Sequence, residues 1–386
     1  MAHRLKVMVF VDWFYPGFKA GGPIQSCINL IDAFTLEWDI YVVTGDRDLH
    51  DTTAYKGIDS NKWTNYQDKA QVYYAKGQRL TTQKIRDLVR SIQPDVLYVN
   101  GMFSWRFSLL PLLTVRNRQI KTIIAPRGML QQGAMQFKRW KKNIFLFCFR
   151  SIGLYRNTYF HATDQQEEKD IQQYIGAHKG TVNVPNFPKM STYSWKPVPK
   201  QPGVLSLVYV SRISPKKNLA FILECLTKID RSRKVSFTIA GEIDDEPYWL
   251  TCKHLIEQVP GNITADFYGP VPNYQLNYFY GNHQVFVLPT LGENYGHAIV
   301  EALLFGKPVI ISDKTPWNHL QEKKIGLNIV LGDSDGFVKA IEKFADMPQS
   351  EYDEWSKAAW RFAAAEQAAA NDLKDTYRQL FISIKT

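Results

Sequence analysis

The sequence of 386 residues has no long apolar segment. Its longest apolar clusters, such as Ile144 to Phe149, are far shorter than the roughly 20 residues that a helix needs to cross a bilayer. The first residues carry only a short apolar run, Val7 to Val11, without the small-residue cleavage pattern of a secretory signal. We therefore expect neither a membrane span nor export.

Cysteine is also scarce and scattered. The four cysteines are Cys27, Cys148, Cys225 and Cys252. They show no paired spacing typical of a zinc site or a disulfide framework, and this favours a reducing cytoplasm. The eight histidines show no HExxH spacing, and neither GxGxxG nor GxxxxGK[ST] occurs. Dinucleotide oxidoreduction and P-loop hydrolysis therefore lack support. The sequence has no low-complexity tract that would indicate extended disorder.

Basic residues and apolar residues are both plentiful. With 45% hydrophobic residues, a chain of this length is expected to form two compact domains rather than one. Its formal charge of +10 predicts an anionic partner, which could be a phosphorylated ligand, an acidic membrane surface or nucleic acid. Charge alone does not choose among these.

Strand-like and helical patterns alternate along the chain, which predicts a parallel α/β sheet in each half. A glycine-rich turn from Gly17 to Pro23 joins the first strand to the first helix. Expected helices of the first half are 24–34 and 82–92. Expected strands are Leu5–Val11, Ile40–Thr44, Val96–Val99, Thr122–Ala125, Leu205–Val210, Ser236–Ala240, Ala265–Tyr268, Val285–Leu288 and Pro308–Ser312.

Five prolines between Val182 and Gly203 predict the interdomain linker, since neither helix nor central strand tolerates them well. We predict domains at 1–190 and 191–365, with a helix at 366–386 that packs back on the first domain. The stretch Tyr352 to Ile384 is rich in Ala, Glu, Gln and Lys and is expected to form two helices.

The most informative segment is Pro289 to Trp317. A strand ending near Leu288 leads through a loop into a helix expected from Ala298 to Phe305, where Gly306 stops it. A helix N-terminus presents outward-pointing N–H groups and a positive dipole end, so a diphosphate would bind well there.

Two acidic residues flank this helix start. Glu293 lies in the loop and Glu301 lies eight positions later in the helix, so both carboxylates can accept hydrogen bonds from sugar or ribose hydroxyls in one crevice at the strand ends. The alternative is structural, with Glu293 capping a turn and Glu301 facing solvent. On the residues alone the two interpretations have equal weight.

A second segment carries two cations. After the strand expected at Leu205–Val210 come Arg212 and, five residues later, Lys217, which could neutralise the charge that grows on a departing diphosphate. Without other information, such residues beside a proline turn form a solvated loop more often than a site.

These segments together resemble glycosyltransferase family 4. The family signature is a Glu, seven residues and a second Glu, followed by a Gly-Lys/Leu-Pro-Val-Ile run. The extension Thr315-Pro316-Trp317 resembles transferases that build bacterial surface polysaccharides. Matching residues are Glu293, Tyr295, Gly296, Glu301, Gly306, Pro308, Val309 and Ile310.

The resemblance implies the GT-B fold, in which two Rossmann-like α/β domains with parallel sheets face each other across a cleft. It also implies a retaining glycosyltransferase that needs no metal and no cofactor, and uses a nucleotide sugar, with UDP favoured over GDP. The short Asp46-Arg47-Asp48 match to metal-dependent transferases is therefore set aside. The implied acceptor is a saccharide or a polyprenyl-diphosphate-linked saccharide in capsule, O-antigen or exopolysaccharide synthesis.

The resemblance also implies residue roles. Glu293 would contact donor-sugar hydroxyls, Glu301 would hold the ribose, and Arg212 and Lys217 would hold the leaving phosphate, although Asn218 stands where the family usually has Gly. Other implied donor-binding residues are Gly21, Gly22, Gly241, Tyr268, Gly269, Asn294, Tyr295, Gly296, His297 and Ala298.

Arg127 follows a strand at a position where many relatives carry His and the polysaccharide-type relatives often carry Arg. We expect it to bind a phosphate or the acceptor. His161 and Glu167 resemble the family's strand and loop before the linker, in a structural or acceptor-facing role.

The segment 138–149 joins a basic, aromatic stretch from Lys138 to Lys142 to the apolar run Ile144–Phe149. It has two interpretations of equal weight. In one, the segment is a helix that touches an anionic membrane surface, which would place the protein in the cytoplasm and peripherally on the inner face of the membrane. In the other, the apolar run packs into the core and the lysines are solvated.

Two rival functions remain. A nucleotide-sugar 2-epimerase of the same fold would release free nucleotide without any acceptor. A non-catalytic basic protein that binds nucleic acid or membrane would not need both the acidic and the basic residue pairs, so we expect no nucleic-acid partner. Calorimetry with UDP and GDP against single-stranded DNA separates the enzyme from the binding protein.

Overall fold

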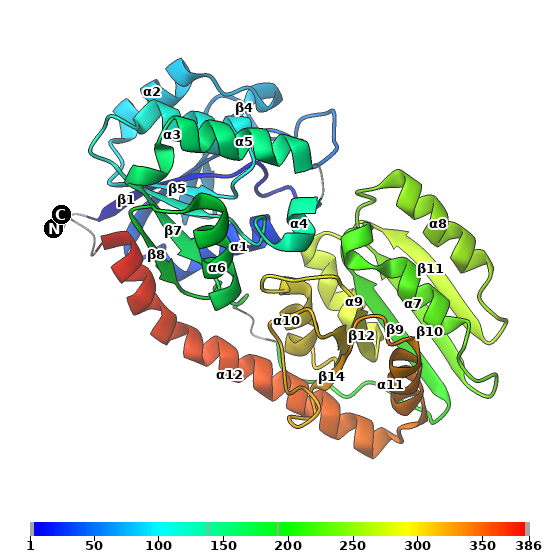
Figure 1. The fold of residues 1–386 in the computed structure, drawn as a ribbon. Helices are drawn as coiled ribbons and strands as arrows, with labels where there is room; N and C mark the ends of the chain where they lie inside the picture. Colours follow the sequence, from blue (N-terminus) through cyan, green and yellow to red (C-terminus); the bar gives the residue numbers. More distant parts are fainter. Residues whose placement is uncertain (1–3, 137–138, 191–192, 383–386) are drawn as a thin grey trace. The chain divides into compact units, whose positions relative to one another are not determined.

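The chain forms two compact α/β units, each built on its own sheet (Figure 1). The computed structural model describes residues 4–136, 139–190 and 193–382. Unit 1 comprises Met1–Phe187 and Ala370–Thr386, and unit 2 comprises Pro188–Ala369.

Unit 1 has an eight-stranded sheet in the order β3-β4-β2-β1-β5-β6-β7-β8, in which only the β3–β4 pair is antiparallel. Its strands are β1 (Leu5–Phe10), β2 (Trp38–Gly45), β3 (Trp63–Tyr66), β4 (Ala70–Ala75), β5 (Val96–Asn100), β6 (Lys121–Ala125), β7 (Thr158–Ala162) and β8 (Gly180–Asn183). Its helices are α1 (Gly22–Phe34), α2 (Thr82–Ile92), α3 (Leu110–Val115), α4 (Gln132–Gln136), α5 (Arg139–Ser151) and α6 (Gln165–Ile175), with short turns η1 (Lys76–Gln78), η2 (Trp105–Leu109) and η3 (Leu154–Asn157).

The first strand explains why this sheet is central. Side chains alternate across a strand, and both faces of β1 are apolar. Met8 and Phe10 join one buried cluster, whereas Val7 and Val9 join the cluster on the other face. A strand buried on both faces is typical of a parallel sheet covered by helices. The chain runs from β1 to β2 on one side and later returns to β5 on the other, so the topological switch point lies between β1 and β5.

Unit 2 has a six-stranded, fully parallel sheet in the order β11-β10-β9-β12-β13-β14. Its strands are β9 (Val204–Val210), β10 (Lys234–Ala240), β11 (Ile263–Gly269), β12 (Val285–Leu288), β13 (Val309–Ser312) and β14 (Gly326–Ile329). Its helices are α7 (Leu219–Leu226), α8 (Glu246–Glu257), α9 (Leu276–Asn282), α10 (His297–Leu304) and α11 (Ser334–Asp346), with turns η4 (Pro215–Lys217) and η5 (Asn273–Gln275).

The sequence patterns located most of these elements. Every strand expected in the two halves is present within a few residues, and α2 has the expected bounds. The patterns did not identify β3, β4, β8 or β14. Three of these strands have only four residues and include polar ones, so they lack the apolar run that identified β12 and β13 at the same length.

The predicted linker is in part a structured segment. Strand β8 includes Val182 and Asn183, so the start of the predicted linker belongs to the sheet of unit 1. Beyond it, the described residues 184–190 and 193–203 form no helix or strand. The later part nevertheless packs on unit 2, because Trp195 donates to Ser356 Oγ at 2.9 Å and Lys200 Nζ donates to the Ala345 carbonyl at 2.6 Å.

The prediction of two helices from Tyr352 to Ile384 was wrong. A single helix of 34 residues, α12 (Gln349–Ile382), covers this stretch. It contains neither glycine nor proline and is rich in alanine, so no residue interrupts it. It begins in unit 2, and its final turns bury Tyr377 and Leu380 in the core of unit 1. Residues 383–386 of the predicted final helix lie outside the described residues.

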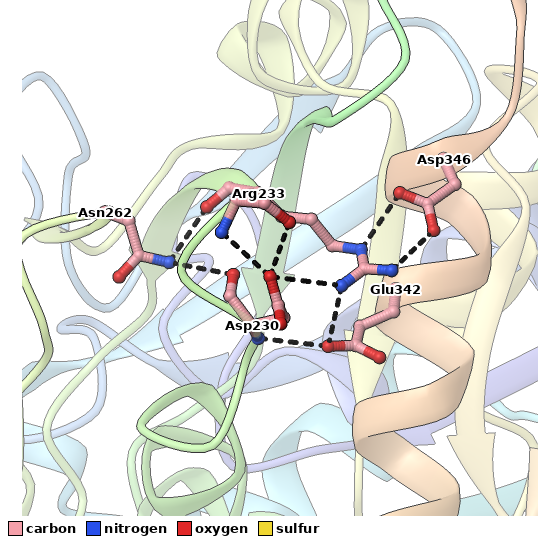
Figure 2. A network of polar contacts seen from close by, with 6 residues as sticks. Asp230, Arg233, Asn262, Glu342 and Asp346 are labelled. Atoms are coloured by element: carbon pink, nitrogen blue, oxygen red, sulfur yellow. Dashed lines mark hydrogen bonds and ion pairs between the residues drawn. The ribbon is translucent and has the colours of Figure 1, made fainter.

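A polar network fixes α11 at the end of the unit 2 sheet where β10 and β11 begin (Figure 2). The Arg233 guanidinium donates to both Asp346 carboxylate oxygens, at 2.9 and 2.8 Å, and to Glu342 at 3.3 Å. Glu342 also accepts from the Asp230 backbone N–H at 3.0 Å, and Asn262 donates to the Arg233 carbonyl at 2.8 Å. The network therefore joins a helix to two loops at the amino ends of the strands.

We expect Arg233→Met to lower the free energy of unfolding by about 1 kcal/mol, because it removes a bidentate ion pair that solvent partly screens. Urea unfolding followed by circular dichroism measures this. Lys339→Met, at an exposed position on α11, is the matched control and should change stability little. Equal stability of the two variants would contradict this role for the network.

Candidate functional site

Three neighbouring loops in unit 2 gather the predicted site residues. Strands β10, β9 and β12 are adjacent and parallel, so their carboxyl ends lie at one edge of the sheet. The loops that leave them carry Gly241, Arg212 with Lys217, and Glu293. In open α/β sheets this edge is where ligands bind.

An ion pair joins two of these loops. Lys217 Nζ contacts Glu293 Oε1, and both side chains are largely buried. The same loops are held by backbone groups: the Leu291 N–H and the Thr290 hydroxyl both donate to the Lys216 carbonyl, at 2.8 and 3.1 Å. The structure thus brings together two residues 76 positions apart, one acidic and one basic.

The charge state of Glu293 follows from this contact. Burial alone raises the pKa of the Glu293 carboxyl, but the adjacent Lys217 and Lys216 outweigh burial and hold the pKa below its ordinary value. Glu293 is therefore ionised at neutral pH and can accept hydrogen bonds only.

Arg212 has an acidic partner that the sequence reasoning missed. Its Nη1 donates to Asp244 Oδ2 at 2.6 Å. The two loops are also joined through their backbones, since Ile213 N–H donates to the Glu242 carbonyl at 2.7 Å and Asp244 N–H donates to the Ile213 carbonyl at 3.0 Å. The only signal for Asp244 was its position three residues after Gly241.

The loop conformation at Asn218 is explained by its side-chain type. Asn218 has φ 59° and ψ 38°, a left-handed conformation that favours Gly. Asn is among the residues that adopt it most readily after Gly, so the departure from the family pattern preserves the backbone shape. Asn218 ends η4 and starts α7, and it thereby fixes the position of Lys217.

The loop before α10 is anchored on both sides. Gly296 precedes the helix in a left-handed conformation with φ 76°, and its carbonyl accepts from the Ile299 and Val300 N–H groups. Trp317 donates its indole N–H to the Tyr295 carbonyl at 2.6 Å, and the Tyr295 ring packs on the His297 ring at 4.9 Å. The N-cap residue Gly296 has no side chain, so no N-cap side chain bonds the first turn of α10, where the positive end of the helix dipole lies.

Glu301 has its own basic partner. Its side chain is almost completely buried, and Lys189 Nζ lies 3.6 Å from its Oε1. Burial raises the pKa of Glu301, and Lys189 only partly offsets this effect. The two acidic residues of the signature therefore contact different lysines. Nothing in the sequence identified Lys189, because it lies in the segment predicted as linker.

Tyr268 and Gly269 end the edge strand β11. The Tyr268 side chain is exposed, and its ring packs edge-on against Phe279 at 4.6 Å. Gly269 has φ 82°, and its carbonyl accepts from the Gly241 N–H at 2.9 Å. An exposed ring at this edge could stack on a planar base.

In unit 1, Gly21 precedes α1 with φ 67° and Gly22 is the first residue of the helix. The preceding turn is held by Asp48, whose Oδ2 accepts from the Phe18 and Lys19 N–H groups at 2.8 and 3.2 Å. Asp46 accepts from Ser60 and from the Gly77 N–H. Both aspartates of the Asp-x-Asp match thus hold loops. No group of three His, Cys, Asp or Glu side chains with metal-site geometry occurs in the described part of the chain.

Arg127 lies inside unit 1 with three oxygen partners. Nε donates to Asn100 Oδ1 at 2.8 Å, Nη2 donates to the Tyr98 hydroxyl at 2.7 Å, and Nη1 contacts Asn186 Oδ1. The network continues to His161, whose two ring nitrogens contact the Tyr98 hydroxyl and the Val184 carbonyl, each at 2.8 Å.

Burial and the adjacent Arg127 lower the pKa of His161 well below its ordinary value, so the ring is neutral at pH 7. Glu167 is buried beside this network and accepts from the Gly128 N–H and from both the N–H and the hydroxyl of Thr163. These contacts give His161 and Glu167 structural partners. Binding of phosphate or acceptor by Arg127 stays a prediction.

A carboxylate at the topological switch point was not identified from the sequence. Asp12 follows β1, Ser104 follows β5, and Ser104 Oγ donates to Asp12 Oδ1 at 2.6 Å. Burial raises the pKa of Asp12 to about 6, although the hydrogen bond from Ser104 acts in the opposite direction. An acidic residue directly after the first strand was a usable signal, since ligands collect at this point.

Comparisons with known proteins agree with this geometry. Residues 196–362 match the family model described as "Glycosyl transferases group 1". A curated relative, described as an uncharacterized 41.2 kDa protein in the cps region of Klebsiella pneumoniae, is 21% identical over 300 residues, covering 75% of this chain and 79% of the relative.

Solved structures share the fold over nearly the whole chain. Sucrose-phosphate synthase from Thermosynechococcus elongatus has a TM-score of 0.73 at 16% identity, covering 99% of this chain and 100% of that chain. HepE of Anabaena, in complex with UDP and glucose, has a TM-score of 0.71 at 13% identity and the same coverage. The two parallel-sheet units therefore form a GT-B fold.

Gly241 tests how the loops depend on backbone geometry. A Cβ added to it would lie 1.8 Å from the Ser211 carbonyl oxygen, and its φ is 154°. We expect Gly241→Ala to lower the free energy of unfolding by about 3 kcal/mol, since the backbone of both loops must shift. Thermal unfolding measures the loss. Gly261→Ala, where added bulk meets no atom within 4 Å, is the control. A stable Gly241→Ala would contradict the described approach of the two loops.

Proposed function

We propose that this protein transfers a sugar from a nucleoside diphosphate sugar to a saccharide or lipid-linked saccharide acceptor, because residues 196–362 match the glycosyl transferases group 1 family and the chain has a GT-B fold. The observation that carries this proposal is the edge of the unit 2 sheet where Lys217 with Glu293 and Arg212 with Asp244 form two ion pairs. Lys217 contacts the loop that leads into α10, and the positive end of that helix dipole would also favour a diphosphate.

The donor complex we propose exchanges one anion for another. Glu293 and Asp244 neutralise the two cations in the structure. The diphosphate would take over these cations, leaving Glu293 to accept hydrogen bonds from sugar hydroxyls and Glu301 to accept them from the ribose. Asn294, Tyr295, Gly296, His297 and Ala298 would meet the sugar and diphosphate, and Tyr268 would stack on the base.

The mechanism we propose retains anomeric configuration. The acceptor hydroxyl attacks the anomeric carbon from the face of the departing phosphate, the glycosidic bond to that phosphate breaks, and a phosphate oxygen takes the hydroxyl proton. Arg212 and Lys217 stabilise the negative charge that develops on the leaving diphosphate. No protein nucleophile and no metal are required.

Unit 1 would supply the acceptor side. Asp12 stands at its topological switch point, where an ionised carboxylate could accept a hydrogen bond from an acceptor hydroxyl. The cps-region relative supports a surface-polysaccharide role, for which a polyprenyl-diphosphate-linked acceptor is chemically suited. The UDP complex of HepE supports UDP as the nucleotide.

The described helices include none that is long and apolar enough to cross a bilayer. Because nucleotide sugars are cytoplasmic metabolites, we place the activity in the cytoplasm at the inner face of the membrane.

The cations provide the direct test of the donor site. We expect Arg212→Gln and Lys217→Gln each to lower kcat/KM by about 10²-fold to 10³-fold, because each removes a charge that stabilises the leaving group. UDP affinity by calorimetry should fall as well. Lys253→Gln, exposed on α8, is the matched control. Product NMR should show an α-linked product from an α-linked donor, whereas free nucleotide with an altered sugar would identify an epimerase. Unchanged UDP binding in both variants would contradict the proposal.

Asp12 predicts a pH dependence. A carboxylate with a pKa of about 6 loses its charge as pH falls through that value, so kcat/KM should decline below about pH 6 and level off above it. Asp12→Asn should lower activity and remove this limb of the profile, with UDP affinity unchanged. Ser104→Ala, which removes a hydrogen bond to the ionised form, should move the limb to higher pH. If Asp12→Asn kept the same acidic limb, that limb would belong to another group, and the role of Asp12 would be contradicted.

A further inference from the structure

Helix α5 has two apolar faces, and only one of them is packed. Phe145, Leu146 and Phe149 are buried in the core of unit 1. Trp140, Ile144 and Phe147 are instead 65%, 55% and 71% exposed. The apolar run is therefore divided between the core and the surface, which neither interpretation of the sequence described. Lys138 lies outside the described residues.

The exposed residues form one stripe. Positions i, i+4 and i+7 lie on the same side of an α-helix, so Trp140, Ile144 and Phe147 point in one direction. Three large apolar side chains on one helix face exceed the scattered single residues that are normal at a protein surface.

Basic residues border this stripe on both sides. At about 100° per residue, Arg139 and Arg150 lie roughly a quarter turn to one side and Lys141 lies a quarter turn to the other. The helix contains no acidic residue, and all three basic side chains are exposed. Lys141 Nζ lies 5.3 Å from the centre of the Trp140 ring, so charge and apolar surface are adjacent.

The helix is held so that this face stays outward. Lys142 Nζ donates to the Ala134 carbonyl at 2.6 Å and lies over the Phe103 ring at 5.0 Å. The Phe103 ring also packs edge-on against Phe145 at 5.3 Å. These contacts fix the rotation of α5 about its axis.

We propose that the exposed face of α5 docks unit 1 on an anionic lipid bilayer. Trp140, Ile144 and Phe147 enter the boundary between headgroups and acyl chains, while Arg139, Lys141 and Arg150 reach lipid phosphates on either side. A nucleic acid would bind the cations, but the three apolar side chains between them would not favour its binding. Docking on the bilayer does not depend on the transferase activity.

Co-sedimentation of the full chain with vesicles tests the docking. We expect binding to vesicles of phosphatidylglycerol and phosphatidylcholine, and at least about 100-fold weaker binding to pure phosphatidylcholine, because three basic residues each contribute to attraction by an anionic surface. A variant with Trp140, Ile144 and Phe147 replaced by Gln should bind anionic vesicles at least about 100-fold more weakly. Replacement of Arg139, Lys141 and Arg150 by Gln should remove the preference for anionic lipid.

The controls are exposed residues on other elements. Leu36→Gln replaces an apolar residue that is 90% exposed, and Arg86→Gln with Arg90→Gln removes two exposed charges from α2. None of these changes should alter vesicle binding. Far-ultraviolet circular dichroism and UDP affinity confirm that each variant is folded, so loss of docking is separable from loss of the proposed activity.

Brominated lipids locate the contact. They quench tryptophan fluorescence at close range, and we expect Trp140→Phe to abolish the quenching while Trp105→Phe, which replaces another exposed tryptophan, retains it. Quenching lost only in Trp105→Phe would overturn the proposal. Absence of vesicle binding would also overturn it, as would a dimer in sedimentation velocity that dissociates in Phe147→Gln, since α5 would then contact a second copy.

Discussion

The ion pair between Lys217 and Glu293 is the interaction on which the account of the site depends. It joins the loop after β9 to the loop after β12, and it keeps a buried carboxylate ionised. An unpaired charge at this depth would be costly, so neither residue can be understood alone. In the proposed donor complex, a diphosphate would displace the carboxylate from Lys217.

The same principle applies at the other predicted residues of unit 2. Arg212 is paired with Asp244, and Glu301 is paired with Lys189. Each expected ligand-binding charge therefore has a counter-charge from a different segment of the chain. A phosphate or hydroxyl group that binds must compete with these counter-charges. This competition favours a ligand that has both phosphate and hydroxyl groups.

Much of the fold could be predicted from the sequence, because apolar runs and glycine turns are local signals. The strands β9, β10 and β12 and the loop at Glu293 were located in this way. Partners such as Asp244 and Lys189 could not be assigned, because their contacts join segments that are distant in the chain. The prediction of two C-terminal helices was wrong because alanine-rich sequence without glycine or proline carries no stop signal. Arg127 was located, but its contacts with Asn100, Tyr98 and Asn186 arise only in three dimensions.

The affinity of UDP for Glu293→Gln tests the central claim most directly. If Glu293 neutralises Lys217 until the diphosphate arrives, its neutral replacement releases the lysine, and calorimetry should show UDP bound at least as tightly as by the unaltered protein while sugar transfer falls. Lys217→Gln should weaken UDP binding under the same conditions. A loss of UDP affinity in Glu293→Gln as large as that in Lys217→Gln would contradict the exchange of carboxylate for diphosphate.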